Sequence, residues 1–164
     1  MKNNIIRTIL IITFISFNYL VFSQRIKKEN YTLTIIKEKI TIENEQKVLI
    51  IPITFTNNTK NLLKYYSMSC SWEDFYSVDN KELQVYRQDC DKNIPTILTL
   101  TPGESKIVEI KLLMSKIIDT SEIEFKIGFN LMKVSSSKKE FDFYEHLKKK
   151  NIIWSKEINL SRCN

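Results

Sequence analysis

Glycine, proline and histidine are scarce in this chain, which has two glycines, three prolines and one histidine among 164 residues. So little glycine argues against a Gly-rich phosphate loop or a collagen-like repeat, and with so few prolines it also argues against a flexible linker. No nucleophile elbow, Walker loop or dinucleotide fingerprint is present. The residues and motifs that most active sites use are therefore scarce. We predict a protein that is not an enzyme and binds no cofactor or metal.

The N-terminus has the layout of a secretory signal peptide. Lys2 and Arg7 precede an apolar run over residues 9–21, and a small residue, Ser23, ends a suitable cleavage site. The alternative is an uncleaved membrane anchor. Asn18 interrupts the run, however, and the run is shorter than the ~20 residues that span a bilayer. We therefore predict export to the periplasm or the exterior, with no membrane span left after cleavage.

Cleavage after residue 23 would leave residues 24–164 as a single domain, long enough for one hydrophobic core. The formal net charge would fall from +6 to +4, because two basic residues leave with the signal. A mild positive excess with scattered lysines gives no reason to expect a nucleic-acid partner. We expect a protein or another envelope component instead.

Hydrophobic residues alternate with polar ones along most of the mature chain, which indicates β-strands. Alternation places four apolar residues of 47–59 on one face and five of 121–134 on another. Turn signals separate the strands, among them Asp79-Asn80, expected to close a hairpin, and Pro102-Gly103. We expect strands within residues 31–42, 47–59, 61–72, 74–87, 96–114, 121–134 and 151–160.

No helical pattern is long enough for a crossover between parallel strands. The pattern therefore predicts an all-β protein, an immunoglobulin-like antiparallel β-sandwich of seven to nine strands. Two irregularities stand out. The alternation slips at Ile36-Lys37, which indicates a bulge or a switch between sheets. Pro52 cannot donate to a strand ladder, so we expect it at a sheet edge or a bulge.

The mature chain would hold three cysteines, Cys70, Cys90 and Cys163. In an exported protein a cysteine pair usually forms a disulfide. We predict Cys70–Cys90, which closes a loop of about 20 residues and stabilises by roughly 3 kcal/mol. Pairing of either residue with Cys163 stays open as an alternative. Cys70 as a nucleophile would need His146, and nothing in the sequence brings the two together.

The aromatic stretch around Cys70 is a possible binding surface, formed by Tyr65, Tyr66, Trp72, Phe75 and Tyr76. Four of these residues must divide between the two faces of a strand, so some would be exposed. The alternative is that they are ordinary strand residues. For Trp72 we favour a place in the core, against the disulfide. The neighbouring acids Glu73 and Asp74 would point to opposite faces of a strand, so they cannot easily act as an acid–base pair.

The segment "DCDKN" (89–93) resembles the start of a calcium loop, with Asp89, Asp91 and Asn93 at the first three ligand positions. The glycine and the glutamate that such a loop requires are replaced by Ile94 and Leu100. We therefore interpret the segment as a turn beside the disulfide.

Two further stretches carry a resemblance. The segment "VLIIPITFTNNT", followed by "LTLTPGESKIVEIKL", resembles small exported bacterial immunoglobulin-like sandwiches. The segment between them, with "MSCSW" and "CDKNIP", resembles a group of uncharacterised exported bacterial proteins. There is also a looser likeness to bacterial proteinase-inhibitor sandwiches. The resemblance covers roughly residues 47–114 and implies the fold, with no established activity to carry over.

These observations favour a non-enzymatic binding or structural module of the cell envelope or exterior. It would recognise its partner through exposed aromatic residues or through pairing at an exposed strand edge. The first alternative is a proteinase inhibitor that acts through an exposed loop, residues 88–95. The second is an enzyme of unknown type built around His146.

Overall fold

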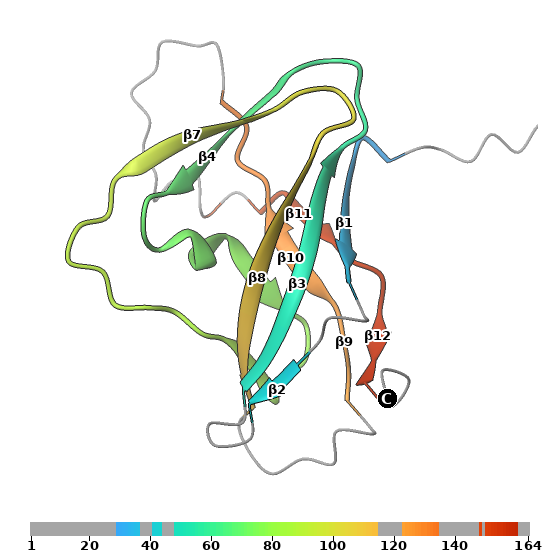
Figure 1. The fold of residues 1–164 in the computed structure, drawn as a ribbon, viewed down its shortest axis with the longest axis vertical. Coiled ribbons are helices and arrows are strands. Elements are labelled where there is room, and N and C mark those ends of the chain that lie inside the picture. The colour runs from blue at the N-terminus through green and yellow to red at the C-terminus, as the bar shows by residue number, and fades with distance from the viewer. Residues whose placement is uncertain are drawn as a thin grey trace, which may run out of the picture.

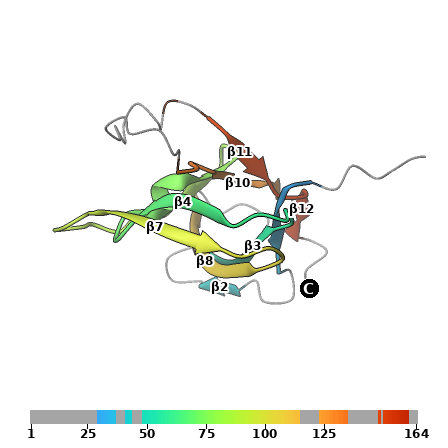
Figure 2. The ribbon, with the colours of Figure 1, turned by 90° about the horizontal axis from the view of Figure 1, so that it is seen from above.

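The computed structural model describes residues 29–36, 41–43, 48–114, 123–134, 148 and 150–160. Their strands are antiparallel and pack in two layers (Figures 1 and 2). Within these ranges no helix is long and apolar enough to cross a bilayer. The predicted signal peptide, His146 and Cys163 lie outside the described residues.

The first layer is a sheet in the order β1-β3-β8-β6, with β2 also paired to β3. This is the order of the first four-stranded sheet of an immunoglobulin-like sandwich. Its strands are β1 (Tyr31–Ile35), β2 (Thr41–Glu43), β3 (Val48–Asn57), β6 (Leu83–Val85) and β8 (Ser105–Met114).

The second layer is centred on one stretch of chain, β9, β10 and the residues that follow them. Strands β11 and β12 pair along one side of this stretch, and β5 pairs along the other. Strand β4 continues that second side, because Tyr66 N donates to Met132 O and Val134 N donates to Lys64 O. Strand β7 pairs with the outside of β4. The strands are β4 (Leu63–Met68), β5 (Tyr76–Val78), β7 (Pro95–Leu100), β9 (Glu124–Phe125), β10 (Ile127–Asn130), β11 (Ile152–Trp154) and β12 (Ile158–Asn159).

The core lies between the two layers and is built from the residues that the alternation predicted. Strand β3 contributes four side chains and the β9–β10 stretch contributes five, each at most 3% exposed. They are Leu49, Ile51, Ile53, Phe55, Ile123, Phe125, Ile127, Phe129 and Leu131. The prediction of an all-β antiparallel sandwich is confirmed.

The described residues form twelve strands rather than seven to nine, because three of the expected strands are each divided in two. Pro52 explains one division. It lies in the central strand β3, not at a sheet edge, and its carbonyl accepts a hydrogen bond from Ile36 N at 2.9 Å. The nitrogen of Pro52 therefore faces the interruption between β1 and β2, where no ladder bond requires a donor.

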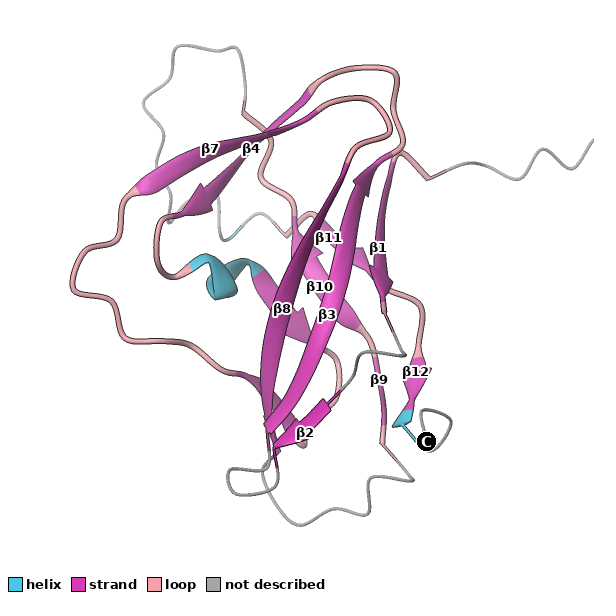
Figure 3. Cartoon of the chain, in the orientation of Figure 1, coloured by secondary structure: helices cyan, strands magenta, loops and turns pink. Residues whose placement is uncertain are grey.

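The expected hairpin around Asp79-Asn80 is absent, because β5 pairs with β10 and β6 pairs with β8. The turn instead carries the chain from the second layer to the first. Its side chains bond to the β9–β10 stretch: Asp79 Oδ1 accepts from Lys126 N at 2.6 Å, and Asn80 Nδ2 donates to Glu124 O at 2.9 Å. A further difference lies before β5, where residues predicted as strand form a short 3-10 helix, η2 (Trp72–Phe75), drawn in cyan in Figure 3.

Asn57, at the end of β3, holds two turns together from a fully buried position. Its Nδ2 donates to the carbonyl oxygens of Asn61, Leu100 and Thr101 at 2.9, 3.0 and 3.2 Å. Its Oδ1 accepts a hydrogen bond from the Thr59 hydroxyl at 2.7 Å. The turn that leaves β3 and the turn that joins β7 to β8 are therefore tied at one point.

The β7–β8 turn has the sequence Thr-Pro-Gly-Glu, and Gly103 adopts φ +78°. A positive φ after proline is the geometry of a type II turn, and glycine adopts it without strain. Glu104 Oε2 accepts from Thr101 N at 2.6 Å and from the Thr101 hydroxyl at 2.9 Å. These hydrogen bonds to the carboxylate lower the pKa of Glu104.

Candidate binding site at the β8 edge

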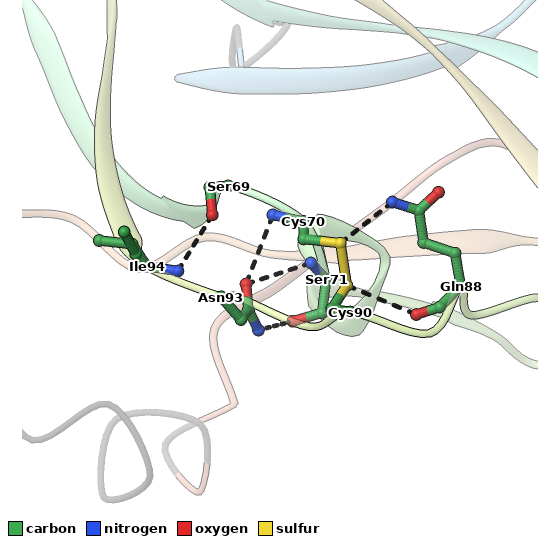
Figure 4. Close-up of a disulfide and its surroundings, with 7 residues drawn as sticks. All are labelled: Ser69, Cys70, Ser71, Gln88, Cys90, Asn93 and Ile94. Atoms are coloured by element: carbon green, nitrogen blue, oxygen red, sulfur yellow. Dashed lines mark hydrogen bonds between the residues drawn. A yellow bond between two sulfur atoms is a disulfide. The ribbon is translucent and has the colours of Figure 1, made fainter.

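The predicted disulfide between Cys70 and Cys90 is confirmed, with a sulfur–sulfur distance of 2.06 Å. It joins the turn after β4 to the loop that leads into β7 (Figure 4). Asn93 strengthens the junction, because its Oδ1 accepts from Cys70 N at 3.4 Å and from Ser71 N at 3.3 Å. Both sulfur atoms are used, so neither of these two cysteines is available as a nucleophile or as a partner for Cys163.

The segment 89–93, which resembles the start of a calcium loop, lies mostly at the surface. Asp89 and Asp91 are exposed, and Asn93 spends its side chain on the Cys70–Ser71 turn. Across the part of the chain that the structure describes, no group of three or more His, Cys, Asp or Glu residues is placed to hold a metal ion. The segment is a mostly exposed loop beside the disulfide.

The aromatic stretch is mostly core. Tyr65, Phe75 and Tyr76 are 4%, 2% and 8% exposed, so the prediction of an exposed aromatic surface is wrong for these three residues. Alternation in β4 and β5 turns the two tyrosines inward, and η2 turns Phe75 inward. Burial raises the pKa of Tyr65 to about 12 and also raises that of Tyr76. Only Tyr66 and Trp72 remain half-exposed.

The buried rings form a cluster with two residues from other strands. Phe129 lies 4.8 Å from Phe55 and 4.9 Å from Tyr76 between ring centroids, and Tyr65 lies 5.7 Å from Phe55. Trp72 packs edge-to-face on Tyr76 at 5.8 Å, at the rim of the cluster. Trp72 is therefore neither fully in the core, as we favoured, nor fully at the surface.

Glu73 and Asp74 separate on η2. Asp74 faces outward and forms an ion pair with Arg87 at 3.0 Å. Glu73 is buried, and its Oε2 has no hydrogen-bond partner among the described residues. Burial raises the pKa of the Glu73 carboxyl. The two carboxylates therefore lie in different environments.

Strand β8 presents an unpaired edge over residues 105–110, which we call the β8 edge. Asn57 N donates to Glu104 O, so the backbone groups of residues 106, 108 and 110 face β3. Those of Ser105, Ile107 and Glu109 point the other way. On that side β6 pairs only with Leu112–Met114, and no strand among the described residues pairs with the β8 edge.

Other strands end the layers in less accessible ways. Strand β1 lies in contact with β11, and β7 begins with Pro95, which has no N–H to offer. The β8 edge also displays an aliphatic side chain, because Ile107 is 60% exposed. It therefore offers a template for an added strand.

Beside the β8 edge a small cavity of about 50 Å³ enters the core, and we call it the β7–β8 slot. It exists because β7 pairs with β4 while β8 pairs with β3, so the two strands diverge from the turn that joins them (Figure 1). Its rim is formed by Ser67, Trp72, Leu98, Lys106 and Val108, and its floor by Phe55, Tyr65, Tyr76 and Phe129.

Of the predicted site residues, the slot brings together Tyr65, Trp72 and Tyr76. Phe75 and Tyr66 lie elsewhere. Sequence reasoning missed Lys106, Val108 and Leu98 as members of a site. The sequence of β8 does indicate a strand with an exposed face. The pattern of alternating residues is the same, however, whether the backbone edge of a strand is paired or free.

Comparisons with known proteins add little to this geometry. No protein-family model matches the chain, and no curated protein matches it. Among solved structures, the chain is similar to a FixG-related protein from Vibrio parahaemolyticus at 10% identity. The match covers 81% of this chain and 96% of the other, with a TM-score of 0.39. A likeness at this level carries no argument about function.

Proposed function

We propose that this protein is an exported, non-enzymatic binding module of the cell envelope or exterior, and that it binds an extended segment of a protein partner at the β8 edge. The observation that supports the proposal is that the backbone of Ser105, Ile107 and Glu109 pairs with no strand in the described part of the chain. The alternative route through exposed aromatic residues has lost support, because three of the five candidates are buried.

An open edge has its own chemistry. Each outward residue offers one N–H and one C=O, and a strand that pairs with them gains about 0.5–1.5 kcal/mol per hydrogen bond. Adding a strand is a common way for a sheet to bind a peptide. The disulfide is in keeping with an oxidising compartment, where the partner would also be found.

The experiment uses a displayed library of short linear peptides, selected on the mature protein. We expect bound peptides to slow hydrogen exchange at the amides of Ile107 and Glu109. Ile107→Pro should abolish binding, because it removes an outward donor that β3 does not use. Ile107→Thr keeps the amide and is the matched control.

Selected peptides that leave both amides unprotected, or that bind Ile107→Pro as well as the parent, would contradict edge pairing. Thermal unfolding of both variants shows whether they fold alike. A comparable melting temperature makes a loss of binding attributable to the edge.

The proteinase-inhibitor alternative has one supporting observation. The loop over residues 88–94 is exposed except at Cys90, where the disulfide anchors it, and Asn93 anchors it again. A tethered, exposed loop can occupy a protease without yielding to it. Incubation with a panel of proteases tests this function: inhibition with an intact loop supports it, and undiminished protease activity rejects it.

A further inference from the structure

We infer that the segment bound at the β8 edge carries an aliphatic side chain that enters the β7–β8 slot and, two residues away, a carboxylate that meets Lys106. This inference rests on the proposed edge pairing and adds the chemistry of the partner. Its basis is the pair Lys106 and Val108, which face the interlayer side of β8 and line the slot.

Strand geometry sets the spacing. The backbone groups of Lys106 and Val108 face β3, so an added strand would meet both residues at non-hydrogen-bonded positions. At these positions opposing side chains lie closest, and residues two apart share a face. The residue opposite Val108 would point between the layers, toward the slot, and the residue opposite Lys106 would lie at its rim.

The slot favours an aliphatic group. Its floor consists of aromatic side chains, so a charged group placed there, below Lys106 at the rim, would lose hydration among the rings. One water needs about 10–15 Å³ of such space. The volume of about 50 Å³ therefore admits a branched aliphatic side chain, while an aromatic ring would have to displace the walls.

Lys106 supplies selectivity. It forms no ion pair among the described residues, although it faces the interlayer side of an edge strand. An inward-pointing lysine on an edge discourages indiscriminate strand pairing. A partner strand with a carboxylate opposite Lys106 forms an attractive ion pair there. Lys106 can therefore disfavour strands that lack an acidic residue and favour those that carry one.

Pairing with a second copy of this chain does not meet the requirement. Antiparallel registers that join at least two of the outward residues of each copy place Val108, Ile110 or Lys106 of the second copy opposite Lys106. None of these residues is acidic. The occupant that fits is a different protein, with an acidic and an aliphatic residue separated by one position.

The test uses the same peptide selection, followed by calorimetry with one selected peptide. We expect enrichment of Asp or Glu two positions from Val, Ile or Leu. Lys106→Glu should weaken binding about fivefold, and a peptide with Lys in place of its acid should recover the loss. Lys60→Glu makes the same charge change at an exposed turn residue and should leave binding unchanged.

A second variant addresses the slot. Leu98→Phe enlarges a rim residue, and it should weaken binding of the aliphatic peptide at least about tenfold. An alanine at the aliphatic position of the peptide should bind the parent protein equally weakly. Both losses should leave the residual complex protected at the Ile107 amide.

The outcomes separate the inference from the function beneath it. Peptides that protect Ile107 but show neither the acidic nor the aliphatic preference overturn the inference and leave edge binding intact. Failure of every peptide to protect Ile107 overturns both. A dimer of the free protein with protected Ile107 would assign the edge to a second copy and overturn the inference as well.

Discussion

The two lateral sides of the sandwich end their sheets differently. On one side β1 lies in contact with β11, and the Lys133 ammonium of the second layer sits 4.4 Å from the ring centre of Tyr31 in the first. The groove there holds about 340 Å³ and is lined by polar and apolar residues alike, such as Thr32 and Ile35. On the other side β7 and β8 diverge, and an apolar slot reaches the aromatic cluster.

This difference shows that strand sequence does not decide whether an edge is covered. Strands β1 and β8 both alternate, and among the described residues both have unpaired backbone on one side, in β8 over residues 105–110. What differs is the strand of the other layer that lies beside each edge. A neighbouring strand in contact limits the approach of another chain, whereas a diverging one leaves the backbone and part of the core open.

The largest expected effect concerns the floor of the slot. Phe129→Ala should lower the free energy of unfolding by about 4 kcal/mol, because the ring packs on Phe55, Tyr65 and Tyr76. Urea denaturation measures the change, with Leu33→Ala on the β1 side as the comparison, at about 3 kcal/mol. A smaller loss for Phe129→Ala than for Leu33→Ala would mean that the slot floor is not part of the core.

Removal of the disulfide should come next. The double substitution Cys70→Ser and Cys90→Ser releases a sequence separation of 20 residues and should cost about 3 kcal/mol. Hydrogen exchange locates the effect, and we expect β7 amides to lose more protection than β1 amides. Equal losses on the two sides would contradict a specific role for the disulfide on the open side.

Asn57 binds the turn from which β7 and β8 diverge, so substitution of its side chain tests the open side of the sandwich. Asn57→Ala should cost about 2 kcal/mol, because three carbonyl oxygens lose their donor in or near the core. Asn58→Ala is the control, since the side-chain amide of Asn58 donates only to the Thr32 hydroxyl among the described residues. If the two variants unfold at the same denaturant concentration, the buried amide does not hold the turns.

The smallest effect is a gain. Glu73→Gln should stabilise by about 1 kcal/mol at pH 7, because it removes the negative charge of a buried carboxylate whose Oε2 has no hydrogen-bond partner among the described residues. Burial raises the pKa of Glu73, so the folded state binds the proton more tightly than the unfolded state, whose pKa is near 4.5. Stability from this group is therefore complete below pH 4.5 and is lost as pH rises through the higher folded value.

A pH series of denaturation curves checks the sign. The difference between Glu73→Gln and the parent should grow as pH rises and level off above the folded pKa. If the difference in unfolding free energy between Glu73→Gln and the parent stays constant with pH, the folded protein does not bury an ionised carboxylate at residue 73.

Much of the fold follows from local pattern. The inward residues of β3 and of the β9–β10 stretch were predictable, because alternation with period two assigns faces without reference to a partner. The Cys70–Cys90 pair was predictable from its separation and its place around two short strands. The burial of the aromatic stretch was not predictable. The helix η2 interrupts the strand and turns Phe75 inward, and alternation does not assign a face to residues in such a helix.

By itself, the sequence determined the strand class, the faces of the long strands and the Pro-Gly turn, and it favoured the Cys70–Cys90 pair without excluding Cys163. The first three depend on neighbouring residues alone. Only the tertiary structure decided that β5 and β6 belong to different layers, that Pro52 is central and that β8 has a free edge beside a slot. The reason is physical: pairing joins residues far apart in the chain, and a backbone edge carries no side-chain signature of whether it is occupied.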